Sequence, residues 1–353
     1  MKEPEFTMRQ DADFRELLLL LPKTEIHLHL EALATVETIW SLMQKYNIHY
    51  DGVETKEDLV KKFQIKTLNE FIFVFINIVQ NSFKEEKDFM LLLADAGEYL
   101  KNNNIVYAEI FFAPTKFLQA GFKYYKIAET LTSGAYAIKQ KYGVDIRFLI
   151  DVSRTFGAEN AMKNLKALLK FRTQAIIGIG LGGSESAGPA KDYAKVYELA
   201  RKNQLRTVAH CGEDLNAFSI WDSIEHLKME RVGHGTSAFQ DEKLLDFLAE
   251  NQMPIEVCPT SNIFTKKFVQ KIENHPVRSF FDKGLNVTIN SDDPTLFSTS
   301  LIDEYMLLYK SGVFSKEEIF KLIKNNIYAT FLPIQEKNAI WQENLALIES
   351  KTA

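Results

Sequence analysis

Only two cysteines, Cys211 and Cys258, occur in the 353 residues, and no C-x-x-C pair is present. Two thiols are too few for a disulfide framework or a four-cysteine zinc site. We therefore expect free thiols in a reducing compartment. The apolar share of 46% is enough for a sizeable core without cross-links.

The sequence also lacks a basic block and a long apolar run. Lysine and arginine are spread along the chain and the net charge is −5, so a nucleic-acid polymer is not an expected partner. The leucine run Leu17–Leu21 is too short for a signal peptide, and no window reaches the length of a membrane span. We expect a soluble cytoplasmic protein without a membrane partner.

A repeated alternation of strand and helix patterns fills the chain. Near-continuous apolar runs are typical of strands buried on both faces of a parallel sheet. Eight such repeats favour a closed (β/α)8 TIM barrel, an α/β fold, over an open doubly wound sheet. No linker divides the chain, so we expect one domain over residues 1–353. The expected strands are Thr24–Leu30, Ile105–Phe112, Asp145–Val152, Ala175–Leu181, Arg206–His210, Arg231–His234, Pro254–Cys258 and Asn286–Asn290.

Two segments depart from this alternation and are predicted to add helices. One is inserted after the first strand, from about Ala32 to Asn104, and the other is the tail after Leu301. The insertion contains the aromatic stretch Leu68–Val79, which suits either extra core helix or a hydrophobic lid over a site.

Histidine and aspartate side chains gather where the predicted strands end. His27 and His29 end the first strand, His210 ends the fifth, and Asp292 follows the eighth. Residues two apart in a strand point to the same side, so both imidazoles of the H-x-H pair can bind one ion. Catalytic residues of TIM barrels lie at these strand ends. Three imidazoles and a carboxylate predict one zinc ion per chain, with a position left for water.

Two more polar groups have a place beside such an ion, which would lower the pKa of its water toward neutrality. His234 ends the sixth strand and could orient the water or take its proton, and Glu213 could carry a proton to a substrate. Each motif alone has an ordinary structural explanation, but together they meet at one end of a barrel. We predict no catalytic role for the histidines in helical or loop contexts, His49, His226 and His275.

The motifs, in this combination and order, resemble those of the adenosine and adenine deaminases within the metal-dependent amidohydrolase barrels. The resemblance implies hydrolytic removal of the 6-amino group of an adenine-containing small molecule, with zinc as cofactor. It runs from about Leu21 to Pro333 and is carried by LPKTEIHLHLE, YAEIFFAP, GIGLGGSE, VAHCGE, ERVGHG, EVCPTSN and TINSDDP.

The same resemblance implies the roles of individual residues. Glu213 would protonate ring N1, and His234 would act on the metal-bound water. Asp293 would contact that water and ring N7, and the backbone N–H of Gly183 would meet ring N3. The zinc ligands would be His27, His29, His210 and Asp292. The family's aromatic lid corresponds to Leu68–Phe75. The residues predicted to contact substrate are His29, Glu31, Gly183, Asp293, Leu68, Phe71, Ile72 and Phe75.

Two departures from the family pattern concern the substrate. Adenosine deaminases carry Asp-Gly where this chain has Glu31-Ala32, and that acid helps to hold the ribose. Glutamate at that position is more typical of adenine deaminases and of enzymes that act on modified adenosines. The segment Gly182–Glu185 reads GGSE, which matches neither the AGDE of adenosine enzymes nor the DSSE of adenine enzymes. We predict an adenine nucleoside, either adenosine or a modified adenosine such as aminodeoxyfutalosine. Free adenine is the alternative.

Two other functions are weighed against this one. Amidohydrolases that cleave esters, amides or phosphotriesters often hold two metals bridged by a carboxylated lysine, but no lysine occurs between Phe171 and Ala190. A barrel kept only as a binding module would be expected to have lost a ligand or proton carrier, and none is missing. The ligand types also suit iron, manganese or cobalt.

Overall fold

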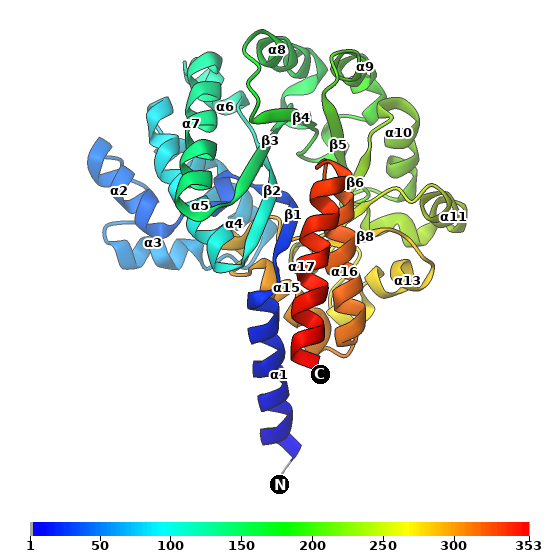
Figure 1. The fold of residues 1–353 in the computed structure, drawn as a ribbon. Helices are drawn as coiled ribbons and strands as arrows, with labels where there is room; N and C mark the ends of the chain where they lie inside the picture. Colours follow the sequence, from blue (N-terminus) through cyan, green and yellow to red (C-terminus); the bar gives the residue numbers. More distant parts are fainter. Residues whose placement is uncertain (1–2, 353) are drawn as a thin grey trace.

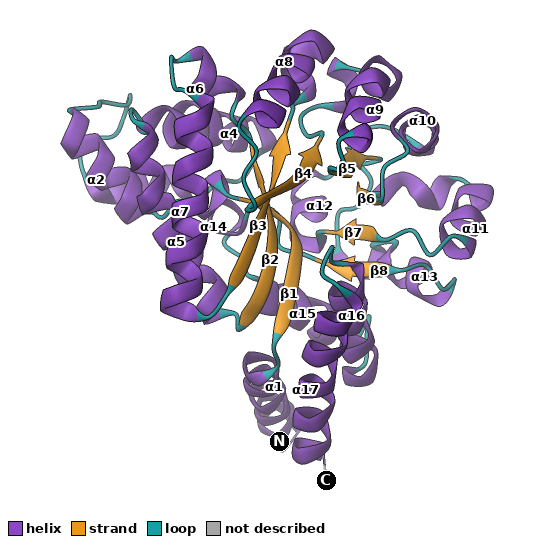
Figure 2. Cartoon of the chain, turned by 45° about the horizontal axis from the view of Figure 1, so that its top comes forward, coloured by secondary structure: helices purple, strands orange, loops and turns teal. Residues whose placement is uncertain are grey.

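The computed structural model describes residues 3–352, apart from the side chains of residues 3–10, Leu68, Asn69 and Thr352. Eight parallel strands form one sheet in sequential order, β1 to β8, and helices surround it (Figure 1, Figure 2). The predicted (β/α)8 barrel is confirmed. The strands are β1 (Lys23–His29), β2 (Ile105–Phe112), β3 (Asp145–Asp151), β4 (Ile176–Gly180), β5 (Arg206–Cys211), β6 (Arg231–His234), β7 (Ile255–Val257) and β8 (Val287–Ile289).

Helices cover the outer face of the sheet, as the amphipathic stretches predict. They are α7 (Tyr124–Tyr142) after β2, α8 (Gly157–Lys170) after β3, α9 (Ala194–Lys202) after β4, α10 (Ala217–Leu227) after β5, α11 (Glu242–Glu250) after β6 and α13 (Val277–Asp282) after β7. Further short helices lie in the loops: α6 (Thr115–Gln119), η4 (Arg154–Phe156), η5 (Glu185–Ala187), η6 (Ala190–Tyr193), η7 (Thr236–Gln240), α12 (Pro259–Thr265), η8 (Ile272–Asn274) and α14 (Pro294–Phe297).

The extra helices expected after the first strand and at the C-terminus are present. Those between β1 and β2 are η1 (Glu31–Leu33), α2 (Val36–Tyr46), α3 (Lys56–Phe63), α4 (Leu68–Phe73), the π-helix η2 (Val74–Gln80), η3 (Glu86–Asp88) and α5 (Phe89–Asn102). Those after β8 are α15 (Leu301–Lys310), α16 (Lys316–Ala329) and α17 (Ile334–Thr352).

An N-terminal helix, α1 (Glu3–Leu20), contains the leucine run and lies beside α17 (Figure 1). Its Phe14 is buried, with its ring centroid 4.6 Å from that of Tyr309 in α15. The run thus belongs to a helix that packs on the barrel's C-terminal helices. Of the helices described, none combines the length and apolarity needed to cross a bilayer.

The barrel closes between β8 and β1 through the backbone of one residue, Asp292. The N–H of His29 donates to the carbonyl oxygen of Asp292 (3.0 Å), and the N–H of Asp292 donates to that of His27 (3.2 Å). Leu28 and Asp292 form an isolated parallel bridge. Because Asp292 joins the two strands, predicted metal ligands from opposite ends of the chain are held in fixed register.

The barrel interior combines a small apolar cluster with a buried cation. Phe111, Leu149 and Val208 form the cluster, and Phe331, from the loop after α16, packs against it. The guanidinium of Arg231 lies 3.9 Å from the centre of the Phe331 ring. The C-terminal segment thus closes one end of the barrel and leaves the carboxyl ends of the strands to form a site.

Candidate active site

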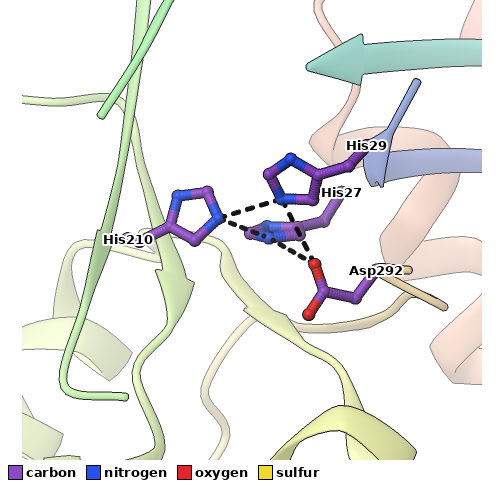
Figure 3. A group of neighbouring side chains, drawn as sticks. All are labelled: His27, His29, His210 and Asp292. Carbon is purple, nitrogen blue, oxygen red and sulfur yellow. Dashed lines mark hydrogen bonds and ion pairs between the residues drawn. The ribbon is translucent and has the colours of Figure 1, made fainter. Parts of the chain in front are cut away.

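Four side chains converge at the carboxyl end of the barrel (Figure 3). The Nε2 atom of His210 lies 3.1 Å from Nε2 of His27 and 3.2 Å from Nε2 of His29. The Oδ1 atom of Asp292 lies 3.5 and 3.3 Å from the nitrogens of His27 and His29. Ligand atoms ~2.0–2.1 Å from a tetrahedral zinc ion lie about 3.3 Å from each other. The residues predicted to bind the metal therefore share one centre with a spacing that fits it.

Local backbone geometry directs the side chains of these predicted ligands toward their common centre. Alternation along β1 puts His27 and His29 on the same side, where His27 is fully buried and His29 stacks on Phe111 with ring centroids 5.2 Å apart. Asp292 has a left-handed backbone with φ of 64°. That conformation is uncommon outside glycine and costs energy. The two backbone hydrogen bonds to β1 stabilise it.

The buried carboxylate of Glu256 orients the His27 ring through its Nδ1 atom, on the side of the ring away from Nε2. The Nδ1 atom of His27 lies 2.7 Å from Oε2 of Glu256, whose Oε1 accepts from Nε of Arg231 at 2.5 Å. The Nη1 atom of Arg231 pairs with Glu109 at 2.6 Å. These four side chains are fully buried or nearly so. A donor hydrogen bond from Nδ1 leaves the Nε2 lone pair free for a metal ion.

Glu213 is positioned by the last residue of the GGSE motif. Oε1 of Glu185 accepts from the N–H groups of Glu213 (2.7 Å) and Asp214 (2.9 Å), and its Oε2 accepts from that of Gly212 (2.9 Å). Desolvation raises the pKa of Glu213 well above its usual range, and the charges of Asp292 and Glu185 raise it further. A pKa raised in this way suits a carboxyl group that is to donate a proton.

His234 and Asp293 complete the polar surroundings. The Nε2 atom of His234 lies 3.5 Å from Oε2 of Glu213 and 4.0 Å from Oδ2 of Asp292. Burial lowers the pKa of His234 to about 3, so its ring is neutral. Burial and the charge of Asp292 raise the pKa of Asp293 to about 8. Oδ1 of Asp293 is buried and has no hydrogen-bond partner among the described residues, so this carboxyl is left to bind a ligand.

Glu31 and Gly183, predicted to contact substrate, both lie at the barrel mouth. Glu31 is fully buried; its Oε1 accepts from the N–H of Ala113 (3.0 Å) and lies 3.4 Å from Nε2 of Gln80. Its Oε2 has no partner in the described part of the chain. Gly183 has φ of +86°, and a Cβ there would lie 2.8 Å from Oγ1 of Thr155. Only glycine fits this position without strain.

The aromatic segment of the insertion docks on the loop that follows β8. Phe71 of α4 stacks on Phe297 of α14, with centroids 5.1 Å apart, and lies 5.8 Å from Phe75. Helix α14 starts directly after Asp293. Ile72, in contrast, is 45% exposed, and the side chain of Leu68 lies outside the described residues. A π-helix such as η2 often marks a functional site.

Several residues that position the site are not among the functional residues predicted from the sequence. Asp151 ends β3, so the strand-end rule that identified His210 could have identified it. Its Oδ1 accepts from the N–H groups of Ser153 (2.7 Å) and Gly182 (2.9 Å), whereas its Oδ2 has no donor among the described residues. Glu256 could have been identified as well, because it is a charged residue inside a strand expected to be buried on both faces.

Replacing Glu256 by Gln should weaken metal binding roughly 10–100-fold, because the charge that strengthens His27 as a ligand is removed while the shape is kept. The dissociation constant for zinc, measured by competition with a chelator, tests this. Glu230→Gln is the control, since Glu230 forms a half-exposed ion pair with Arg206. Equal zinc affinities in the two variants would contradict the role of Glu256.

Comparison with known proteins identifies the family. The protein-family model described as "Adenosine deaminase" matches residues 22–346 of this chain. Adenine deaminase of Crocosphaera subtropica is 31% identical, covering 93% of this chain and 99% of the relative. Aminodeoxyfutalosine deaminase of Streptomyces avermitilis is 31% identical, covering 94% and 92%. Adenosine deaminase of Clostridium kluyveri is 30% identical, covering 95% and 97%.

A solved structure agrees with these relatives. The crystal structure of adenine deaminase from Arthrobacter aurescens superposes with a TM-score of 0.88 at 27% identity, covering 93% of this chain and 99% of that one. The barrel, the converging histidines and the family match lead to one conclusion: the chain belongs to the adenosine deaminase family and is a hydrolytic deaminase.

Proposed function

We propose that this enzyme catalyses the zinc-dependent hydrolytic deamination of the 6-amino group of an adenine nucleoside, either adenosine or a modified adenosine. The observation that carries the proposal is the convergence of His27, His29, His210 and Asp292 on one centre, beside the carboxyl of Glu213, whose pKa is raised by burial. When bound, zinc lowers the pKa of a water molecule toward neutrality and so supplies hydroxide as the nucleophile.

The chain's own residues bind the purine and move its protons. Glu213 gives its proton to ring N1, which makes C6 electrophilic. Asp293, whose raised pKa favours a protonated carboxyl, donates a hydrogen bond to ring N7 and contacts the attacking oxygen. The N–H of Gly183 binds ring N3, and the neutral His234 faces the attacking oxygen through Nε2. Addition of oxygen at C6 and departure of ammonia then give the 6-oxo product.

Two unpartnered acceptor atoms favour a nucleoside over the free base. Among the described residues, Oε2 of Glu31 is buried without a donor, and Oδ2 of Asp151, close to Gly182, accepts no hydrogen bond. Leaving a buried acceptor such as Oε2 of Glu31 unpaired costs ~1–3 kcal/mol. Free adenine offers one N–H on its N9 side, whereas a sugar offers several hydroxyl donors. Sugar hydroxyls therefore match both acceptors.

Free adenine is the second candidate. Glu31 and Ser184 depart from the adenosine-deaminase pattern toward that of adenine enzymes, and the names of the relatives include both. A panel of adenosine, 2′-deoxyadenosine, 5′-methylthioadenosine, aminodeoxyfutalosine and adenine, compared by kcat/KM, tests the proposal. The highest value should belong to a nucleoside. A highest value for adenine would reject the nucleoside assignment, and no turnover of any compound would reject the proposed function.

Glu213→Gln should keep zinc but lower turnover by roughly 10²–10⁴-fold, because a proton donor is removed and no ligand is. His210→Ala should lose both the metal and the activity. Metal analysis of the purified variants beside an ultraviolet deamination assay separates the two effects. A near-normal rate in Glu213→Gln would remove its assigned role, and full zinc occupancy in His210→Ala would count against the ligand set.

Glu31→Ala should raise KM roughly tenfold or more for substrates that bear a sugar and less for adenine, since a hydrogen bond to a charged or buried acceptor is lost. Steady-state kinetics with adenosine and adenine measure the ratio. Glu37→Ala, in which an exposed acid of α2 is removed, is the control. The same rise for both substrates in Glu31→Ala would separate Glu31 from sugar recognition.

A further inference from the structure

A chain of hydrogen bonds runs from the backbone at the start of α13 to His234. The N–H of Val277 donates to Nδ1 of His275 (3.0 Å). Nε2 of His275 lies 3.3 Å from Oδ1 of Asn262, and Nδ2 of Asn262 lies 3.2 Å from Nδ1 of His234. The side chains of His275, Asn262 and His234 are 4%, 2% and 1% exposed. The chain is thus shielded from solvent along its whole length.

The backbone end sets the direction of every link, because a peptide N–H can only donate. Nδ1 of His275 must accept from Val277. Burial lowers the pKa of His275 to about 3, so its ring is neutral and carries its single proton on Nε2. That proton is donated to Oδ1 of Asn262, which turns the amide nitrogen toward His234. The amide N–H then donates to Nδ1 of His234.

We propose that Asn262 and His275 are positioning residues that hold the proton of His234 on Nε2, so that His234 donates a hydrogen bond to the oxygen attacking the substrate. The identity of that oxygen rests on the proposed function. Nε2 faces the site, 3.5 Å from Glu213 and 4.0 Å from Asp292. A fixed donor aimed at an oxygen that gains negative charge stabilises the transition state.

The first test reads the tautomer directly in the wild-type enzyme loaded with zinc. Long-range ¹⁵N–¹H correlation spectra of ¹⁵N-histidine-labelled protein distinguish a protonated ring nitrogen from an accepting one. His234→Phe assigns the signals. We expect Nε2 of His234 to carry the proton and Nδ1 to accept. A proton on Nδ1, or fast exchange between tautomers, would overturn the inference without any other variant having to fold.

The second test reverses the link to His234. Asn262→Asp keeps the shape but replaces the donating Nδ2 by an acceptor, so the proton of His234 should move to Nδ1. We expect kcat to fall roughly 10–100-fold, with a smaller change in KM. Asn251→Asp, at the exposed C-terminal end of α11, makes the same chemical change away from the site and should alter neither. An unchanged tautomer and kcat in Asn262→Asp would refute the proposal.

Substitutions of His275 separate positioning from packing. The side-chain amide in His275→Gln can still accept from Val277 and donate to Asn262, so the tautomer and most of kcat should be kept. His275→Phe fills the space without a donor and should lose both. Equal kcat values in the two variants would contradict the inference. An active enzyme with the proton on Nδ1 refutes this inference alone, whereas inactivity toward every adenine compound refutes the proposed function whatever the tautomer.

Discussion

The carboxylate of Glu256 is the contact on which the rest of the site depends. It accepts from Arg231 at 2.5 Å on one oxygen and lies 2.7 Å from Nδ1 of His27 on the other. Burying charges is costly unless each has partners, and removing one partner of a buried pair typically costs ~3–5 kcal/mol. Here Glu109 shares the guanidinium, and the ring of Phe331 lies over it. Packing at the closed end of the barrel is thereby tied to the orientation of His27, a proposed metal ligand.

A second constraint acts where the sheet closes. Asp292 is both a proposed metal ligand and the backbone bridge between β8 and β1. The residue before it is held by Glu25, which accepts from the N–H and the Oγ of Ser291 at 2.8 and 2.6 Å. A ligand carried by a free loop could relax away from the ion. A ligand that also closes the barrel cannot move without opening the sheet, which keeps the site preorganised for charge stabilisation.

Much of the fold and the converging side chains could be predicted because the sequence patterns that indicate them are local. The H-x-H spacing of His27 and His29, and the place of His210 at a strand end, follow from periodicity and from the rule that barrel chemistry lies at carboxyl strand ends. The seventh and eighth strands end one residue earlier than predicted, at Val257 and Ile289, since α12 begins at Pro259 and the backbone of Asp292 is left-handed.

The positioning groups could not be found in the same way because their partners are distant in sequence. Glu256 meets His27 across 229 residues, and Asn262 reaches His234 across 28. The loop context of His275 predicts no catalytic role, and its side chain contacts Asn262 rather than the proposed metal ligands; this position depends on the fold alone. The oxygens of Glu31 and Asp151 that accept no hydrogen bond from the described residues likewise become visible only when their neighbours are known.

The central claim is that one divalent ion, held by three histidines and an aspartate, makes this barrel a deaminase. Stepwise addition of zinc to the metal-free enzyme, with deamination of adenosine measured after each step, tests it most directly. Activity should rise in proportion to zinc and stop rising at one ion per chain. Full activity without metal, or activity that appears only with a second ion, would contradict the account.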